Sequence, residues 1–290
     1  MLLDESFLRK LDVLSLATRR PVHGQLRGVH RSRRTGSGMV FTDFRPYSAG
    51  DDIRHIDWSI YLRLDRLILK LFEEEADLPI YVLVDASASM GFGTPPKLDY
   101  ACKTAAALAY VALLNHDRVN LAAFADGIVQ TLPTRRGKSH APQVFRFLER
   151  LNASGQTSLH AALRGYFGSP RARGMAIVIS DFLDPEGIEP AFAVLRRCRQ
   201  TVVAVHVVDA EEREPRLPEE VVLVDAEDGT ANELEITPSL LEAYRQTFAS
   251  HVREIEAYCR KYAWSYVPAP TQVKLEELML KLLREQGLLR

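Results

Sequence analysis

Residues 78–89 read LPIYVLVDASAS, and this stretch decides the fold. Its first seven residues form a continuous apolar run, which is typical of a parallel strand buried on both faces. Similar runs occupy 174–180 (GMAIVIS) and 201–208, the latter rich in β-branched residues. Between them, helical periodicity marks residues 97–115, 139–151, 158–167 and 187–199. This alternation predicts an α/β fold: a mostly parallel sheet with helices on both faces.

Two Asp-Gly pairs indicate tight turns within this alternation of strands and helices. Asp126-Gly127 joins β-rich runs at 118–125 and 128–133, so one strand of the sheet is expected to be antiparallel. Asp228-Gly229 predicts a second hairpin, inserted near 219–236. Beyond it, Thr237-Pro238 is typical of a helix N-terminus, and a last strand and a closing helix are expected at 264–268 and 273–285.

Composition places the chain among ordinary globular proteins. Its 290 residues include 37 Lys+Arg and 38 Asp+Glu, and the formal net charge of −1 argues against a molecule-wide field for nucleic acid or membranes. The longest charge-free apolar stretch, 104–115, is shorter than the ~20 residues of a membrane span. Acidic residues near the start do not resemble a secretory signal. The three cysteines form no CxxC pair, and a cytoplasmic location with free thiols is expected.

The first 77 residues differ from the rest, so we expect an N-terminal extension over 1–77 and the α/β domain over 78–290. The extension begins with a helix near 4–16. Residues 18–42 then carry six arginines and no carboxylate. This segment could grip nucleic acid, or pair with the acidic run at 73–77 or with an acidic partner.

A polar motif follows within the extension, at residues 51–58. The side chains of Asp51, Asp52, Arg54 and Asp57 could form an acid/base or second metal site. A structural turn is favoured, in which carboxylates accept backbone N–H groups and pair with arginine. Trp58 is expected to pack in the core.

The residues that carry chemistry follow the buried strands. Asp85, Ser87 and Ser89 leave the first strand, Asp181 follows 174–180, and Thr157 lies in a loop that enters a helix. In open α/β sheets this carboxyl edge is where ligands bind. Two carboxylates and three hydroxyls, without His or Cys, suit a hard cation such as Mg²⁺ (or Mn²⁺ or Ca²⁺). Such a cation could keep a coordination position open for a carboxylate of another protein.

This set resembles the metal-ion-dependent adhesion site of von Willebrand factor A domains. The resemblance implies that Ser87, Ser89 and Thr157 contact the metal, that Asp85 and Asp181 set its charge, and that an acidic side chain of a partner completes the shell. It also implies a von Willebrand factor A-like, Rossmann-like fold.

The N-terminal part resembles an uncharacterised bacterial family, domain of unknown function fifty-eight, which often accompanies MoxR-type AAA+ ATPases. The resemblance covers roughly residues 25 to 210. Its motif residues, structural or partner-binding, are Arg33, Arg34, Arg45, Asp51, Asp52, Arg54, Asp57, Trp58 and Arg63.

We therefore expect a metal-dependent protein-binding module, not an enzyme, that works with a MoxR-type ATPase or its client in protein assembly or maturation. Two alternatives stay open. One is a Mg²⁺-dependent hydrolase or phosphatase that uses the same crevice. The other is nucleic-acid binding through the arginine-rich segment.

Overall fold

The computed structural model describes residues 2–18, 39–48, 51–74, 79–227 and 229–285. The chain divides into two compact units: Met1–Pro21 together with Leu78–Arg290, and Val22–Asp77. This differs from the expected division at residue 77, because the first helix belongs with the α/β unit.

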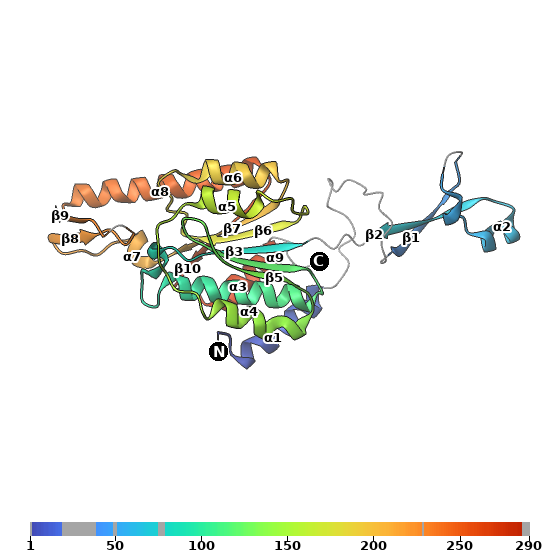
Figure 1. The fold of residues 1–290 in the computed structure, drawn as a ribbon, viewed down its shortest axis with the longest axis horizontal. Helices are drawn as coiled ribbons and strands as arrows, with labels where there is room; N and C mark the ends of the chain where they lie inside the picture. The colour runs from blue at the N-terminus through green and yellow to red at the C-terminus, as the bar shows by residue number, and fades with distance from the viewer. Residues whose placement is uncertain (1, 19–38, 49–50, 75–78, 228, 286–290) are drawn as a thin grey trace. The chain divides into compact units, whose positions relative to one another are not determined.

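The α/β unit is built on a six-stranded sheet with the order β10-β7-β6-β3-β4-β5 (Figure 1). Every neighbouring pair is parallel except β4 and β5, which form the antiparallel pair predicted from Asp126-Gly127. All six residues of the central strand β3 are buried, as its apolar run predicts. The strands are β3 Ile80–Asp85, β4 Val119–Phe124, β5 Ile128–Arg135, β6 Met175–Ser180, β7 Thr201–Val208 and β10 Ser265–Pro270.

Helices cover both faces of this sheet, and each face has its own apolar core (Figure 1). One face carries α1 Glu5–Thr18, α3 Lys97–Leu114, α4 Ala141–Leu148 and α9 Leu275–Glu285; the other carries α5 Leu159–Phe167, α6 Ile188–Arg197 and α8 Pro238–Lys261. Ala101, Ala105 and Ala109 of α3 are fully buried, because their small side chains let the helix lie close to its neighbours. The sequence thus predicts the mixed α/β architecture correctly.

Helix α1 packs on α3 through a short apolar stripe. Phe7 and Leu11 of α1 are buried in the core. The Tyr110 hydroxyl of α3 donates to Asp12 Oδ1 at 2.8 Å. These contacts explain why the first helix belongs to the α/β unit.

The predicted inserted hairpin is also present. After the short helix α7 Ala210–Arg213, strands β8 Glu220–Val224 and β9 Ala231–Glu235 pair antiparallel in a two-stranded sheet of their own. Thr237 then caps α8, since its side chain accepts from the Leu240 N–H at 3.2 Å.

The second unit holds strands β1 Met39–Pro46 and β2 Ile68–Glu74, which pair antiparallel, and the short helix α2 Trp58–Leu64. The Asp57 carboxylate caps α2 by accepting from the N–H groups of Ser59 and Ile60 at 2.9 and 3.2 Å. The expectation that Trp58 packs in the core is wrong. Trp58 is the first residue of α2 and is 55% exposed, and its ring makes an edge-to-face contact with the ring of Tyr61.

Within the part of the chain that the structure describes, no helix is both long enough and apolar enough to cross a membrane.

Candidate functional site

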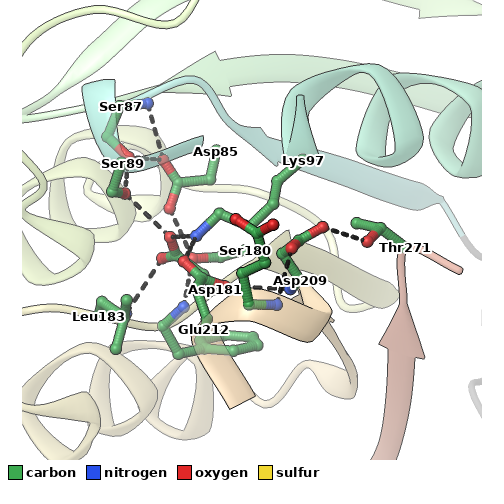
Figure 2. Close-up of polar contacts among 12 residues, drawn as sticks. Asp85, Ser87, Ser89, Lys97, Ser180, Asp181, Leu183, Asp209, Glu212 and Thr271 are labelled. Atoms are coloured by element: carbon green, nitrogen blue, oxygen red, sulfur yellow. Dashed lines mark hydrogen bonds and ion pairs between the residues drawn. The ribbon is translucent and has the colours of Figure 1, made fainter. Parts of the chain in front are cut away.

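Asp85 and Asp181 stand at the same end of the sheet, on neighbouring strands. Asp85 is the last residue of β3, Asp181 directly follows β6, and these two strands pair in parallel. Both side chains are buried, with exposed fractions of 0% and 1%. Figure 2 shows their carboxylates facing one another within a polar cluster. The topology therefore brings together two acids that are 96 residues apart in the sequence.

The Asp85 carboxylate is held entirely by serine groups. The backbone N–H and the hydroxyl of Ser87 donate to its Oδ1 at 2.9 and 2.7 Å. The Ser180 hydroxyl donates to its Oδ2 at 2.5 Å. Burial, reinforced by the charge of Asp181, raises the pKa of Asp85 to about 7, although the hydrogen bonds from Ser180 and Ser87 act in the opposite direction.

The Asp181 carboxylate receives three donors. Its Oδ2 accepts from the Ser89 hydroxyl at 2.9 Å and from Lys97 Nζ at 2.6 Å, and its Oδ1 accepts from the Leu183 N–H at 3.1 Å. The next residue, Phe182, lies in the left-handed region with φ of 56°, a conformation that a non-glycine residue adopts at a cost. The turn directs its N–H to the Ser180 hydroxyl at 2.8 Å and so fixes the loop.

The two halves of the cluster are joined by their serines. The hydroxyl oxygens of Ser87 and Ser89 lie 3.1 Å apart, so the Asp85 and Asp181 halves of the cluster meet at these two serines (Figure 2). Four of the five predicted site residues thus form one network.

A lysine that the sequence analysis did not assign also enters this network. Lys97, the first residue of α3, is fully buried and reaches both Asp181 and Glu212 of α7 (Figure 2). Burial alone would lower the pKa of Lys97, but the two carboxylates outweigh it and raise that pKa above its ordinary value. Burial raises the pKa of Glu212, with Lys97 acting against it. Close to Glu212, Asp209 accepts a hydrogen bond from the Thr271 hydroxyl at 2.6 Å.

The fifth predicted residue, Thr157, lies in a loop that is joined to the segment 85–89 by backbone hydrogen bonds. The Ala88 N–H donates to the Gly155 carbonyl at 2.9 Å, and the Ser154 N–H donates to the Ala86 carbonyl at 2.8 Å. Thr157 itself contacts an unpredicted residue, Glu227, which lies between β8 and β9. Its hydroxyl donates to Glu227 Oε1 at 2.6 Å and its N–H donates to Oε2 at 3.0 Å.

The donor set fits a divalent cation on two grounds. Every predicted ligand offers oxygen, which hard cations prefer. Among Asp85, Asp181, Glu212 and Lys97, three carboxylates oppose one ammonium, which leaves two negative charges when all are ionised. Buried charge of this kind is balanced by protons or by a metal. Within the described residues, no group of three or more His, Cys, Asp or Glu side chains is placed to hold a metal.

The motif residues of the second unit make structural contacts. Arg45 pairs with Asp51 at 2.6 Å and lowers the pKa of that carboxyl; Arg54 pairs with Asp52 at 2.7 Å and lowers its pKa to about 2. These are the contacts expected of a structural turn. Arg63 is exposed near the end of α2. Arg33 and Arg34 lie outside the described residues.

Comparison with known sequences identifies the family. The pattern of DUF58, described as a protein of unknown function, matches residues 43–258. The chain belongs to the DUF58 family. Uncharacterized proteins of Mycobacterium tuberculosis and Mycobacterium bovis are each 31% identical to it over 261 residues, covering 87% of this chain and 81% of theirs.

Solved structures give more distant matches to this DUF58 protein. The conserved hypothetical protein BatB of Bacteroides thetaiotaomicron is 18% identical over 73% of this chain and 98% of its own, with a TM-score of 0.45. An aerotolerance-related membrane protein of Bacteroides fragilis is 17% identical with the same coverage and a TM-score of 0.41.

Proposed function

We propose that this DUF58 protein is a metal-dependent protein-binding module. Its α/β unit is a von Willebrand factor A-like domain in which Asp85, Ser87, Ser89, Thr157 and Asp181 hold Mg²⁺. When bound, this ion supplies an electrophilic position that accepts the carboxylate of a partner's Asp or Glu. The protein chain performs no bond chemistry in this proposal; it holds the ion, sets its charge and presents it.

The observation that carries the proposal is the direction of the hydrogen bonds. Ser87 gives its proton to Asp85, and Ser89 gives its proton to Asp181. A serine hydroxyl has one proton and two lone pairs. With the proton committed to a carboxylate behind it, each hydroxyl has lone-pair capacity for a cation.

This arrangement leaves the carboxylates behind the hydroxyls, where they set the charge. Asp85 has no exposed surface, while Ser89 is partly exposed. A cation that is contacted mainly by neutral hydroxyls keeps more of its positive charge than one wrapped by carboxylates, which favours capture of an acidic side chain.

The expected partner is a MoxR-type AAA+ ATPase or a client that it remodels in protein assembly or maturation. This part of the proposal is supported by the resemblance of the motif residues of the second unit and of the adhesion-site residues. A cytoplasmic location stays a prediction from the sequence.

The buried state of Asp85 weighs against the enzyme alternative. A nucleophilic aspartate has to reach its substrate, yet both Asp85 oxygens are engaged by serine hydroxyls and the residue is fully buried. The other alternative, nucleic-acid binding, depends on an arginine-rich segment that lies mostly outside the described residues, so it stays an alternative.

A pull-down with the full chain tests the proposal. Lysate of the source organism is passed over immobilised protein in Mg²⁺ or in EDTA, and captured proteins are identified by mass spectrometry. The test variant is Ser89→Ala, which removes one hydroxyl and leaves the Lys97–Asp181 ion pair in place. The matched control is Ser154→Ala, in the exposed part of the neighbouring loop. A protein captured only in Mg²⁺, by wild type and control but not by Ser89→Ala, supports the proposal. Identical captures in every lane would overturn it.

A further inference from the structure

The contact between Glu227 and Thr157 joins two parts of the chain that are 70 residues apart. Both carboxylate oxygens of Glu227 are used, one by the Thr157 N–H and one by its hydroxyl. Thr157 is buried and Glu227 is half-buried. Charge-assisted bonds of this two-point kind are among the stronger and more specific contacts that a carboxylate makes.

The two strands of the hairpin that carries Glu227 are largely exposed to solvent. Nearly every residue of β8 and β9 is exposed, including the apolar Val222 and Val224 at 58% and 63%. An isolated two-stranded hairpin is marginally stable in water. The contact between Glu227 and Thr157 therefore ties an exposed hairpin to the loop that carries Thr157.

The turn of this hairpin is built to present Glu227. The Glu227 N–H donates to Asp225 Oδ1 at 2.7 Å, and the Asp225 N–H donates to the Thr230 carbonyl at 2.9 Å. Gly229 closes the turn with a φ of 75°, a conformation that favours glycine.

We infer that Glu227 is an internal ligand of the adhesion site, which holds the place of the partner's acidic side chain until the partner displaces it. This inference rests on the proposed function, because it requires Thr157 to belong to the metal site. The Thr157 hydroxyl has lone pairs for a cation while it gives its proton to a carboxylate. A cation held by the Thr157 hydroxyl would lie beside the Glu227 carboxylate, whose Oε1 is 2.6 Å from that oxygen, so Glu227 and a partner's carboxylate that approaches the same cation exclude each other.

The consequence is a site that is closed in the isolated protein. A partner's carboxylate binds only the fraction of molecules whose hairpin is released, so the apparent affinity is reduced by that fraction. The ligand class follows from the contact: a carboxylate on a flexible side chain, with both oxygens free to accept hydrogen bonds.

The test uses the full chain and the variant Glu227→Gln, which keeps the shape of the side chain and replaces one acceptor oxygen by a donor. The matched control is Glu233→Gln on the exposed strand β9 of the same hairpin. The probe is a fluorescent, end-blocked Gly-Glu-Gly peptide in Mg²⁺, measured by fluorescence anisotropy. Binding of Mg²⁺ alone is measured by calorimetry for all three proteins.

If Glu227 occupies the site in about nine molecules out of ten, Glu227→Gln binds the peptide about tenfold more tightly than wild type and control, with unchanged Mg²⁺ affinity. Equal peptide affinity in all three proteins, with Mg²⁺ bound by each, would overturn the inference and leave the metal site standing. A loss of Mg²⁺ affinity in Glu227→Gln would overturn it differently, by making Glu227 a permanent metal ligand. Absence of Mg²⁺ binding in all three would overturn the proposed function, and the inference with it.

Discussion

Replacement of Asp85 by asparagine probes the buried charge on which the site depends. In the folded protein the pKa of Asp85 is raised from 3.8 to about 7, first by burial and then by Asp181. Because the folded pKa lies above the unfolded one, the folded state binds an extra proton between these values. The free energy of unfolding therefore falls as the pH rises through this window, and the cost is fully present above about pH 7.

The size of the effect follows from the same two values. The gap between 3.8 and about 7 corresponds to about 4 kcal/mol at pH 8 in the absence of metal. Asp85→Asn removes this cost. It introduces a smaller one of about 1–3 kcal/mol, because the amide nitrogen cannot accept the Ser180 hydroxyl proton. The variant is thus expected to be more stable than wild type by about 2 kcal/mol, or about 4–8 °C in melting temperature.

Thermal unfolding followed by circular dichroism in EDTA measures this difference. Near pH 5 the cost to wild type is less than half as large, so the advantage of Asp85→Asn should vanish. His206, whose pKa is lowered to about 4 mainly by burial, affects both proteins equally and cancels. Added Mg²⁺ should stabilise wild type alone. A variant that is less stable than wild type by the same margin at both pH values would refute the reasoning.

Four further substitutions test individual contacts in the two units. Lys97→Met should lower the free energy of unfolding by about 3–5 kcal/mol, because it leaves two buried carboxylates without their cation. Urea unfolding should show this loss. Mg²⁺ should restore part of the lost stability if the ion binds beside the same carboxylates. Gly174→Ala should destabilise by about 1–3 kcal/mol, because a Cβ there would lie 2.1 Å from the Pro79 carbonyl oxygen. Gly165→Ala in α5 has open space and should instead stabilise by about 0.5–1 kcal/mol in the same assay. Asp57→Ala removes the cap of α2 and should cost that helix about 1 kcal/mol, seen as faster amide exchange in residues 58–64 with the α/β unit unchanged.

Local sequence patterns predict the sheet and bring four of the five candidate site residues together, because the causes of both are local. The apolar runs of β3 and β6 fix two buried parallel strands, and chain order then brings Asp85 and Asp181 to one edge. The spacing of Ser87 and Ser89 places both hydroxyls in the loop that leaves β3. Each of these inferences needs only a few neighbouring residues.

The unpredicted residues are those brought in by long-range packing. Lys97 and Glu212 are 115 residues apart, and no local pattern marks either as a partner of Asp181. The Asp-Gly hairpin turn is predicted, but nothing in its sequence indicates that Glu227 contacts Thr157. Trp58 is expected in the core, but the structure places it at the start of a short capped helix and leaves it exposed. Tertiary structure alone supplied these contacts.

The most direct test of the central claim is calorimetric titration of Mg²⁺ into the full chain at neutral pH, with Ser89→Ala and Ser154→Ala beside wild type. The account predicts one bound ion per chain in wild type and in Ser154→Ala, with affinity lost or at least tenfold weaker in Ser89→Ala, as expected when a ligating oxygen is removed. Absence of binding in wild type, or equal binding in all three proteins, would contradict a metal site at the ends of β3 and β6.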